Sequence, residues 1–233
     1  MKFTSIFIGA IATFLCSCST LAPSKDVAMT ASRQASIKPA DAIQLLKDGN
    51  ARFVAGRGIN HRYRAQVEAT KAGQFPFASI VSCLDSRTSS EIIFDQGIGD
   101  IFNARVAGNV VNSDILGSLE YGSKFAHSKA IVVVGHSHCG AVKGVCDHVK
   151  LGNLTTLLKR LEPALAATKS APGEDRSSHN HDFVDRVAEE NVKETVKNIR
   201  RNSSVLAEME KSGELTIRGA MYDVETGKVH FLD

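Results

Sequence analysis

The chain has 233 residues, of which 43% are hydrophobic and 23% charged, as in an ordinary globular protein. Lysine and arginine number 28 against 25 for aspartate and glutamate, and no basic stripe with interleaved aromatic residues runs along the chain. Composition and charge therefore exclude a nucleic acid as the expected partner and favour one domain with one sizeable core.

The first 18 residues have the features of a secretory signal peptide. Lys2 gives a basic start, and the apolar run Ile6–Leu15 is too short to span a bilayer comfortably. Residues 15–19 resemble a bacterial lipoprotein processing site, at which Cys18 becomes the lipidated first residue, and ordinary cleavage near Ala22 is the alternative. We therefore expect the protein to lie in the periplasm or cell envelope. Its sorting signal is compatible with the outer membrane, and it would contact a membrane only through a lipid anchor on Cys18.

Residues 19–36 are small and polar and show no apolar period, which predicts a flexible tether. The folded domain is expected over residues 37–233. Its first element is a helix from Lys38 to Val54, because apolar residues recur there near helical spacing and a proline suits the first turn.

Two short apolar runs rich in β-branched residues, Phe77–Ser82 and Ala130–Val134, predict buried parallel strands. Between them, Asp100–Val106 can form another strand, and Ser113–Phe125 reads as a helix that turns Tyr121 toward the core. Parallel neighbours need crossover connections, so this alternation predicts an α/β fold with a central, mostly parallel sheet flanked by helices.

The C-terminal half continues with helical spacing over Leu151–Ala167 and over Phe183–Arg200. A polar stretch, Lys169–Asp175, separates the two as a surface loop. The last segments, Leu215–Tyr222 and Lys228–Leu232, predict a terminal hairpin or an edge pair of strands.

Three cysteines remain after the signal peptide: Cys83, Cys139 and Cys146. An odd number does not suit a disulfide framework in an oxidising compartment, whereas metal ligation of two of them would keep these as thiolates. Cys146 is expected to be a buried apolar thiol on a helix.

Two polar clusters, Cys83–Arg87 and His136–Gly140, each follow a predicted central strand. Ligands of such sheets gather at the carboxyl ends of the strands, so Cys83, His136 and Cys139 are expected to meet there. Two thiolates and one imidazole suit zinc, and three protein ligands leave the fourth tetrahedral position open, as in catalytic sites. A redox pair of Cys83 with Cys139 is a further possibility, although the chain has no Cys-X-X-Cys motif.

The pattern Cys83-X-Asp85-X-Arg87, followed by His136-X-X-Cys139, resembles the zinc signature of the β-class carbonic anhydrases of the plant-like subtype. The resemblance covers residues 37–233 and includes segments 49–53, 104–109, 120–122 and 222–227. It implies the β-carbonic anhydrase fold and the reversible hydration of carbon dioxide to bicarbonate and a proton.

The resemblance also implies the roles of the site residues. Cys83, His136 and Cys139 would bind one Zn2+ per chain, with water or hydroxide as the fourth ligand. Asp85 and Arg87 would be the catalytic pair, in which Arg87 donates to Asp85 and Asp85 orients the zinc-bound hydroxide. In some relatives the counterpart of Asp85 moves onto the metal and closes the site.

Four further positions match the substrate-binding residues of the family. Gln74 matches an amide that donates to bicarbonate, and Phe102, Ala107 and Tyr121 match an apolar wall that receives carbon dioxide, although a polar loop and ordinary core packing are the alternatives. The family completes this pocket across a dimer interface, so we expect a homodimer or a higher even oligomer. Ile80 stands where relatives with a regulatory bicarbonate site have Trp, so we do not expect that site.

Two other functions stay open on the same residues. Relatives with this zinc set hydrolyse carbon disulfide or carbonyl sulfide, and a non-catalytic zinc-binding protein of the envelope is a third hypothesis. Asp85 and Arg87 argue against the third, because zinc storage needs neither. His138, between two ligands, is either a proton carrier or a neighbour without catalytic duty.

Overall fold

The computed structural model of the chain describes residues 24–25 and 28–232. The predicted signal peptide and Cys18 lie outside the described residues. Within the described parts of the chain, no helix combines the length and the apolar character needed to cross a membrane.

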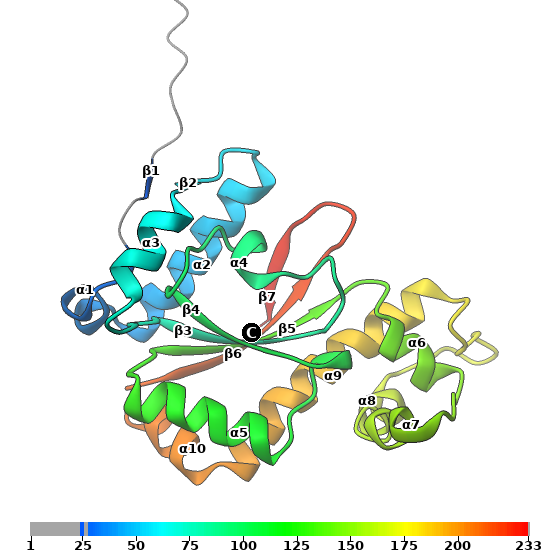
Figure 1. Ribbon diagram of the computed structural model, residues 1–233. Coiled ribbons are helices and arrows are strands. Elements are labelled where there is room, and N and C mark those ends of the chain that lie inside the picture. Colours follow the sequence, from blue (N-terminus) through cyan, green and yellow to red (C-terminus); the bar gives the residue numbers. More distant parts are fainter. Residues whose placement is uncertain (1–23, 26–27, 233) are drawn as a thin grey trace, which may run out of the picture.

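A five-stranded sheet lies at the centre of the structure (Figure 1). Its strand order is β4 (Ile101–Arg105), β3 (Ala78–Ser82), β5 (Ala130–His136), β6 (Thr216–Tyr222) and β7 (Val229–Leu232). Neighbouring strands from β4 to β6 are parallel, and β7 alone in this sheet runs antiparallel, as the second strand of a hairpin with β6. The predicted mostly parallel sheet and terminal hairpin are confirmed.

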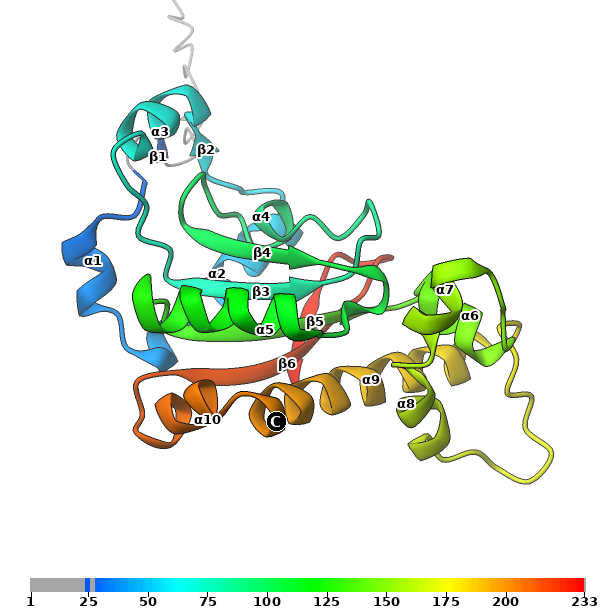
Figure 2. The ribbon, with the colours of Figure 1, turned by 60° about the horizontal axis from the view of Figure 1, so that its bottom comes forward.

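Helices cover both faces of this sheet (Figures 1 and 2). One face carries α2 (Pro39–Val54) and the short α4 (Ser90–Ile93). The other face carries α5 (Ser113–Glu120), α9 (His181–Asn202) and α10 (Ser204–Lys211). Beyond α2 lie α3 (Tyr63–Thr70) and the small parallel pair of β1 (Ser24–Lys25) and β2 (Asn60–His61).

The alternation of side chains along β5 explains the two layers. Every residue of this strand is buried, because both of its faces meet helices. Val132 and Val134 pack in the core cluster shared with α2, whereas Ile131 and Val133 pack in the cluster that contains the apolar face of α9. The uninterrupted apolar run that predicted this strand is therefore a consequence of burial on both sides.

Past the carboxyl ends of the strands lie α6 (Gly140–Cys146), α7 (Gly152–Leu158) and α8 (Glu162–Ala167) (Figure 2). The last two replace the single helix predicted over residues 151–167. Pro163 lies in the first turn of α8, where its missing N–H costs no hydrogen bond, and it could not continue α7.

The helix predicted over residues 113–125 also differs in its last part. After Glu120 the chain makes one π-helical turn, Tyr121–Phe125, and Tyr121 is 58% exposed instead of facing the core. Gly122 takes the inward position, because its backbone lies so close to the sheet that a Cβ would be 3.0 Å from Ser79 Oγ. Tyr121, the preceding residue, therefore points outward.

The tether predicted over residues 19–36 is corrected from residue 28 onward. Met29 lies in the core cluster beneath α2, and the chain then forms α1 (Ala31–Ser36). Gln34 is buried, and its amide group donates to two backbone carbonyl oxygens at 2.7 Å each. Individual tertiary contacts hold this segment, so the lack of an apolar period did not reveal that it is folded.

Candidate metal centre

The two predicted polar clusters meet at the carboxyl edge of the sheet. Cys83 directly follows β3, His136 is the last residue of the neighbouring β5, and Cys139 is the N-cap of α6. Their ligand atoms all lie within 4.8 Å of one another, and all three side chains are buried. The structure thus brings together the three residues that the sequence predicted as metal ligands.

The distances and hydrogen bonds of these residues fit a tetrahedral zinc ion. The two sulfur atoms are 4.0 Å apart, and two thiolates each about 2.3 Å from a tetrahedral zinc lie about 3.8 Å apart. His136 Nδ1 is 2.9 Å from the carbonyl oxygen of Ser137, which can only accept, so Nδ1 donates and Nε2 keeps its lone pair. Nε2 is buried and has no hydrogen-bond partner among residues 24–25 and 28–232. Burying such a nitrogen without a partner lowers the stability of the fold, and a metal ion would provide the partner.

The electrostatics of the two thiols also favour a cation. Their mutual hydrogen bond lowers the pKa of Cys83 to about 4, and the same hydrogen bond, together with burial, raises the pKa of Cys139. Two buried sulfurs at this separation repel each other when both are ionised, so one gains the charge at the expense of the other. A divalent ion removes that repulsion and allows both to be thiolates.

Asp85 and Arg87 form the expected bidentate pair at the edge of this group. Arg87 donates from Nε to Oδ1 at 3.0 Å and from Nη2 to Oδ2 at 2.8 Å, and its backbone N–H donates to Oδ1 at 2.9 Å. These bonds hold the pKa of Asp85 at about 2, so the carboxylate is charged at neutral pH. Asp85 Oδ2 lies 4.0 Å from His136 Nε2, so the carboxylate borders the ligand atoms while it stays paired with Arg87.

Neighbouring elements fix the turn His136–Cys139. The N–H of Ser137 donates to a carbonyl of β6 at 3.0 Å, and the N–H of His138 donates to Asp185 Oδ1 of α9 at 2.8 Å. The latter bond supports the left-handed backbone of His138, whose φ is +57°. The ring of His138 is 3.1 Å from the carboxylate of Glu225.

Gly135 allows α9 to pack closely against the strand that ends in His136. A Cβ at Gly135 would lie 2.5 Å from Val192 and 2.8 Å from the sulfur of Met221. Any larger residue would therefore push α9 and the end of β5 apart, next to a metal ligand.

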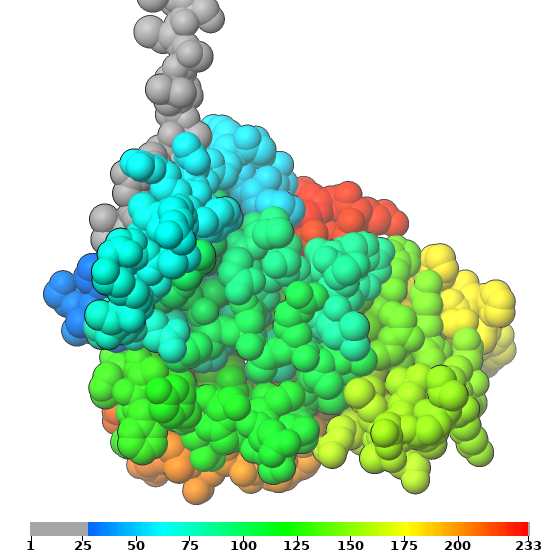
Figure 3. Space-filling model, viewed as in Figure 1, coloured from blue at the N-terminus to red at the C-terminus, as the bar shows by residue number. Residues whose placement is uncertain are grey.

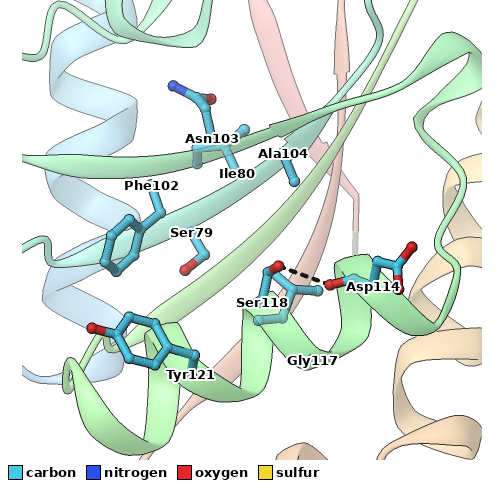
Figure 4. Close-up of a pocket in the computed structure, with 10 residues that line it drawn as sticks. Ser79, Ile80, Phe102, Asn103, Ala104, Asp114, Gly117, Ser118 and Tyr121 are labelled. Carbon is cyan, nitrogen blue, oxygen red and sulfur yellow. Dashed lines mark hydrogen bonds between the residues drawn. The ribbon is translucent and has the colours of Figure 1, made fainter.

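The four expected substrate-binding residues lie in different places relative to the ligands of their own chain. Phe102 and Tyr121 line one end of a pocket of about 510 Å³ between β4 and α5 (Figure 4). This pocket lies on the face shown in Figure 3, where α5 reaches the surface. Ala107 instead begins the 3₁₀ turn Ala107–Asn109 beside Cys83, and Gln74 is exposed in the loop before β3.

Sequence reasoning assigned no role to several residues that hold the ligands in place. Thr88 and Arg105 bind the backbone around Cys83, while Asp185 of α9 accepts from the N–H of His138 and Asn191 of α9 donates to the carbonyl of Gly108. Asn191 left a signal, because it is a polar residue within the buried apolar stripe of its helix. The others left no signal, because polar residues in loops, at strand ends and on the polar side of a helix are common.

Comparisons with known proteins agree with this geometry. Residues 78–229 match the family described as carbonic anhydrase. Carbonic anhydrase 2 of Mycobacterium tuberculosis is 36% identical over 206 residues, which are 84% of this chain and 93% of that protein. The carbonic anhydrase of Mycolicibacterium smegmatis is 36% identical over 197 residues, which are 82% of this chain and 92% of that protein.

Solved structures are similar over most of the chain. The β-carbonic anhydrase CafA of Aspergillus fumigatus has a TM-score of 0.64 and 28% identity, covering 83% of this chain and 90% of that one. The work on two β-carbonic anhydrases of Sordaria macrospora, described as tetrameric, supplies a second similar chain. It has a TM-score of 0.60 and 27% identity, and the match covers 70% of this chain and 83% of that one. Since the family match spans both ligand-bearing segments and the sheet between them, this chain belongs to the carbonic anhydrase family and has the fold of its β class.

Proposed function

We propose that this enzyme is a zinc-dependent carbonic anhydrase that interconverts carbon dioxide and bicarbonate, with Cys83, His136 and Cys139 as its zinc ligands. One observation carries the proposal. Two sulfur atoms and an unpartnered, buried imidazole nitrogen converge within 4.8 Å of one another in a chain whose relatives are named carbonic anhydrase.

The residues around this group have separate tasks in the proposed reaction. A zinc ion held there would lower the pKa of a water molecule and supply the hydroxide that adds to carbon dioxide. Asp85, ionised and at the border of the ligand group, can accept a hydrogen bond from that water and so direct its oxygen lone pair toward the substrate. Arg87 occupies both oxygens of Asp85 and keeps this carboxylate from becoming a fourth ligand.

We further propose that a second copy of the chain completes the substrate pocket. Phe102 and Tyr121 lie away from their own ligand group, and the stacked rings of Tyr121 and Phe125 are 58% and 76% exposed. Aromatic rings in such a position favour an interface, and the similar proteins of Sordaria macrospora are described as tetrameric. Sedimentation of the purified protein should therefore give an even multiple of the chain mass, and a monomer would contradict the proposal.

For the location, we propose export to the periplasm or cell envelope with a lipid anchor on Cys18. The basic start, the short apolar run and the processing site of residues 1–19 support this. Metabolic labelling with a radioactive fatty acid should mark the parent and leave Cys18→Ser unmarked, and equal labelling of both would contradict the anchor.

The catalytic proposal is tested by zinc analysis and stopped-flow carbon dioxide hydration on the purified chain lacking residues 1–18. We expect one zinc per chain, and we expect carbon dioxide turnover to fall on metal removal and to return on zinc addition. Carbon disulfide and carbonyl sulfide serve as parallel substrates, and faster turnover of either would favour the sulfur hydrolase instead. A protein that binds no zinc would contradict the assigned site.

A further inference from the structure

We propose that Arg105 is a positioning residue for the metal-binding loop, by which we mean residues 83–88. In this proposal Arg105 holds the backbone of the loop from outside the metal centre and so sets the direction of the side chains of Cys83 and Asp85. The inference rests on the proposed function and deepens it, because Cys83 is one of the proposed zinc ligands.

The first observation is the hydrogen bonding of the Arg105 side chain. Arg105 is the last residue of β4 and lies opposite Ser82, which directly precedes the metal-binding loop. Its guanidinium donates to three consecutive carbonyl oxygens: from Nε to Cys83 at 3.1 Å, and from Nη2 to Leu84 at 3.2 Å and Asp85 at 2.6 Å. One side chain thus satisfies the backbone acceptors of three successive residues.

These carbonyl groups have few other donors. Residues 83–88 belong to no helix or strand, so neither ladder nor helix supplies their hydrogen bonds. Thr88 donates its N–H to the oxygen of Asp85 at 3.1 Å, and its hydroxyl lies 3.1 Å from the oxygen of Cys83 and 2.9 Å from that of Asp85. Arg105, with donors in a rigid fork, adds a second donor at both of these oxygens and also reaches the oxygen of Leu84, to which Thr88 does not donate.

The direction of the loop side chains follows from this arrangement. Since three successive carbonyl groups are directed at one guanidinium, the loop curls around Arg105. Cys83 then points inward and is 4% exposed, whereas Leu84 points outward and is 60% exposed. Asp85 is next in line, at the position from which it meets both Arg87 and the ligand group.

The chain that follows Arg105 also contacts the ligand sulfur. The N–H of Gly108 points at Cys83 Sγ at 3.4 Å, and the carbonyl of Gly108 accepts from the buried amide of Asn191 at 2.7 Å. Segment 105–108 therefore contacts the residue Cys83 at its carbonyl group and at its sulfur. Loosening Arg105 should loosen the ligand without removing any donor atom from the metal.

The test compares Arg105→Met, which keeps length but has no donors, with Arg105→Lys, which keeps the charge and a compact donor group. Arg64→Met, at an exposed arginine of α3, is the matched control. For each protein, purified without residues 1–18 like the parent, we would measure zinc release to a chelator, kcat and KM for carbon dioxide hydration, and the melting temperature of the zinc-free form.

Arg105→Met should release zinc about 10- to 100-fold faster than the parent, the usual effect of losing a group that orients a metal ligand. Its kcat should fall while KM stays within about twofold, and its zinc-free melting temperature should match the parent. Arg105→Lys should give a zinc release rate and a kcat between those of Arg105→Met and the parent, and Arg64→Met should behave as the parent. If Arg105→Met does not fold, Arg105→Lys alone must release zinc faster than the parent at an unchanged zinc-free melting temperature.

Two outcomes would overturn the inference. One is zinc release from Arg105→Met at the parent rate, and the other is a lower zinc-free melting temperature with unchanged zinc release, which would make Arg105 a purely structural residue. Both presuppose a parent that binds zinc and hydrates carbon dioxide. A parent that does neither would overturn the proposed function itself, so the two failures are distinguishable.

Discussion

His136 and Cys139 are each 1% exposed and lie between a central strand and α6, whereas the metal-binding loop that carries Cys83 has Leu84 60% exposed and the side chain of Arg87 51% exposed. Backbone groups of β6 and a carboxylate of α9 hold the first region, and polar side chains hold the second. We therefore call residues 136–139 the rigid half of the candidate metal centre, because core elements hold them, and the metal-binding loop its adjustable half, because the loop is partly exposed and side-chain hydrogen bonds hold it.

The largest effect expected from this comparison is the loss of a ligand from the rigid half. His136→Ala should abolish zinc binding and reduce carbon dioxide hydration to background, and it should also lower the free energy of unfolding of the zinc-free protein by about 1–3 kcal/mol, because it opens a cavity in the core. Metal analysis, stopped-flow assays and urea unfolding would measure these three quantities.

Cys83→Ser is the matched variant in the adjustable half. It should lose zinc and activity as completely, yet change the unfolding free energy of the zinc-free protein by less than about 1 kcal/mol. Equal destabilisation by Cys83→Ser and His136→Ala would show that the two halves are not mechanically different.

The next effect concerns the pair that keeps the adjustable half open. Arg87→Ala should keep zinc and the fold but lower kcat about 10- to 100-fold, because Asp85 is then free to occupy the metal. Arg87→Lys, which can restore one hydrogen bond, should recover part of the rate. Turnover of Arg87→Ala at the parent rate would show that Arg87 does not guard the open position.

The pH dependence should come from the metal and not from Asp85. The pKa of Asp85, about 2, lies below its ordinary value of 3.8, so the stabilisation from its pair with Arg87 is complete above about pH 4 and is lost as the pH falls toward 2. Two thiolates would offset the charge of a zinc ion. Such a zinc should lower the pKa of its bound water less than a zinc with three neutral histidine ligands, whose bound water has a pKa of about 7.

We therefore expect kcat to rise with pH above neutrality, without an inflection from Asp85 between about pH 6 and pH 9. A kcat profile recorded over this range checks the expectation, and Asp85→Asn should lose rate without moving the midpoint. A rate already at its plateau at pH 6 would refute it.

The smallest effect is expected at the cysteine outside both halves. Burial raises the pKa of Cys146 to about 11, so this thiol is neutral at physiological pH, and it packs among apolar residues of α6. Cys146→Ala should keep one zinc per chain and a kcat within about twofold of the parent, and lose about 1 kcal/mol of stability or less. Metal analysis and stopped-flow assays check it, and a loss of zinc would mean that the wrong thiols have been assigned.

The sequence predicted the rigid half well, for physical reasons. A buried parallel strand needs an uninterrupted apolar run, which residues 130–134 show, and the carboxyl ends of neighbouring strands meet at one edge. The meeting of Cys83, His136 and Cys139 follows from these two facts. Family resemblance, rather than spacing, suggested the pairing of Asp85 with Arg87, which the structure shows as a bidentate contact.

The remaining features depend on tertiary contacts, which produce no periodic pattern in the sequence. Nothing in the spacing of Arg105 shows that its guanidinium bends back to the chain after β3. The exposure of Tyr121 depends on a π-helical turn and on the close approach of Gly122 to the sheet. In the proposed oligomer, the way in which Gln74 and Phe102 would meet a substrate depends on a second copy of the chain, which the pattern of one sequence does not reveal.

The folded start of the chain limits where it can be shortened. A truncation at Ile37 would remove Gln34 and leave the buried carbonyl group of Pro76 without this donor, at a cost of about 1–3 kcal/mol, and the half-buried carbonyl group of Ala126 likewise at a smaller cost. It would also remove Met29 from the core. Expression boundaries should therefore lie before residue 28. The two cleavage points expected from the leader, at Cys18 and near Ala22, both lie before the folded segment that starts at residue 28. Cleavage at either point would therefore leave the hydrophobic core intact.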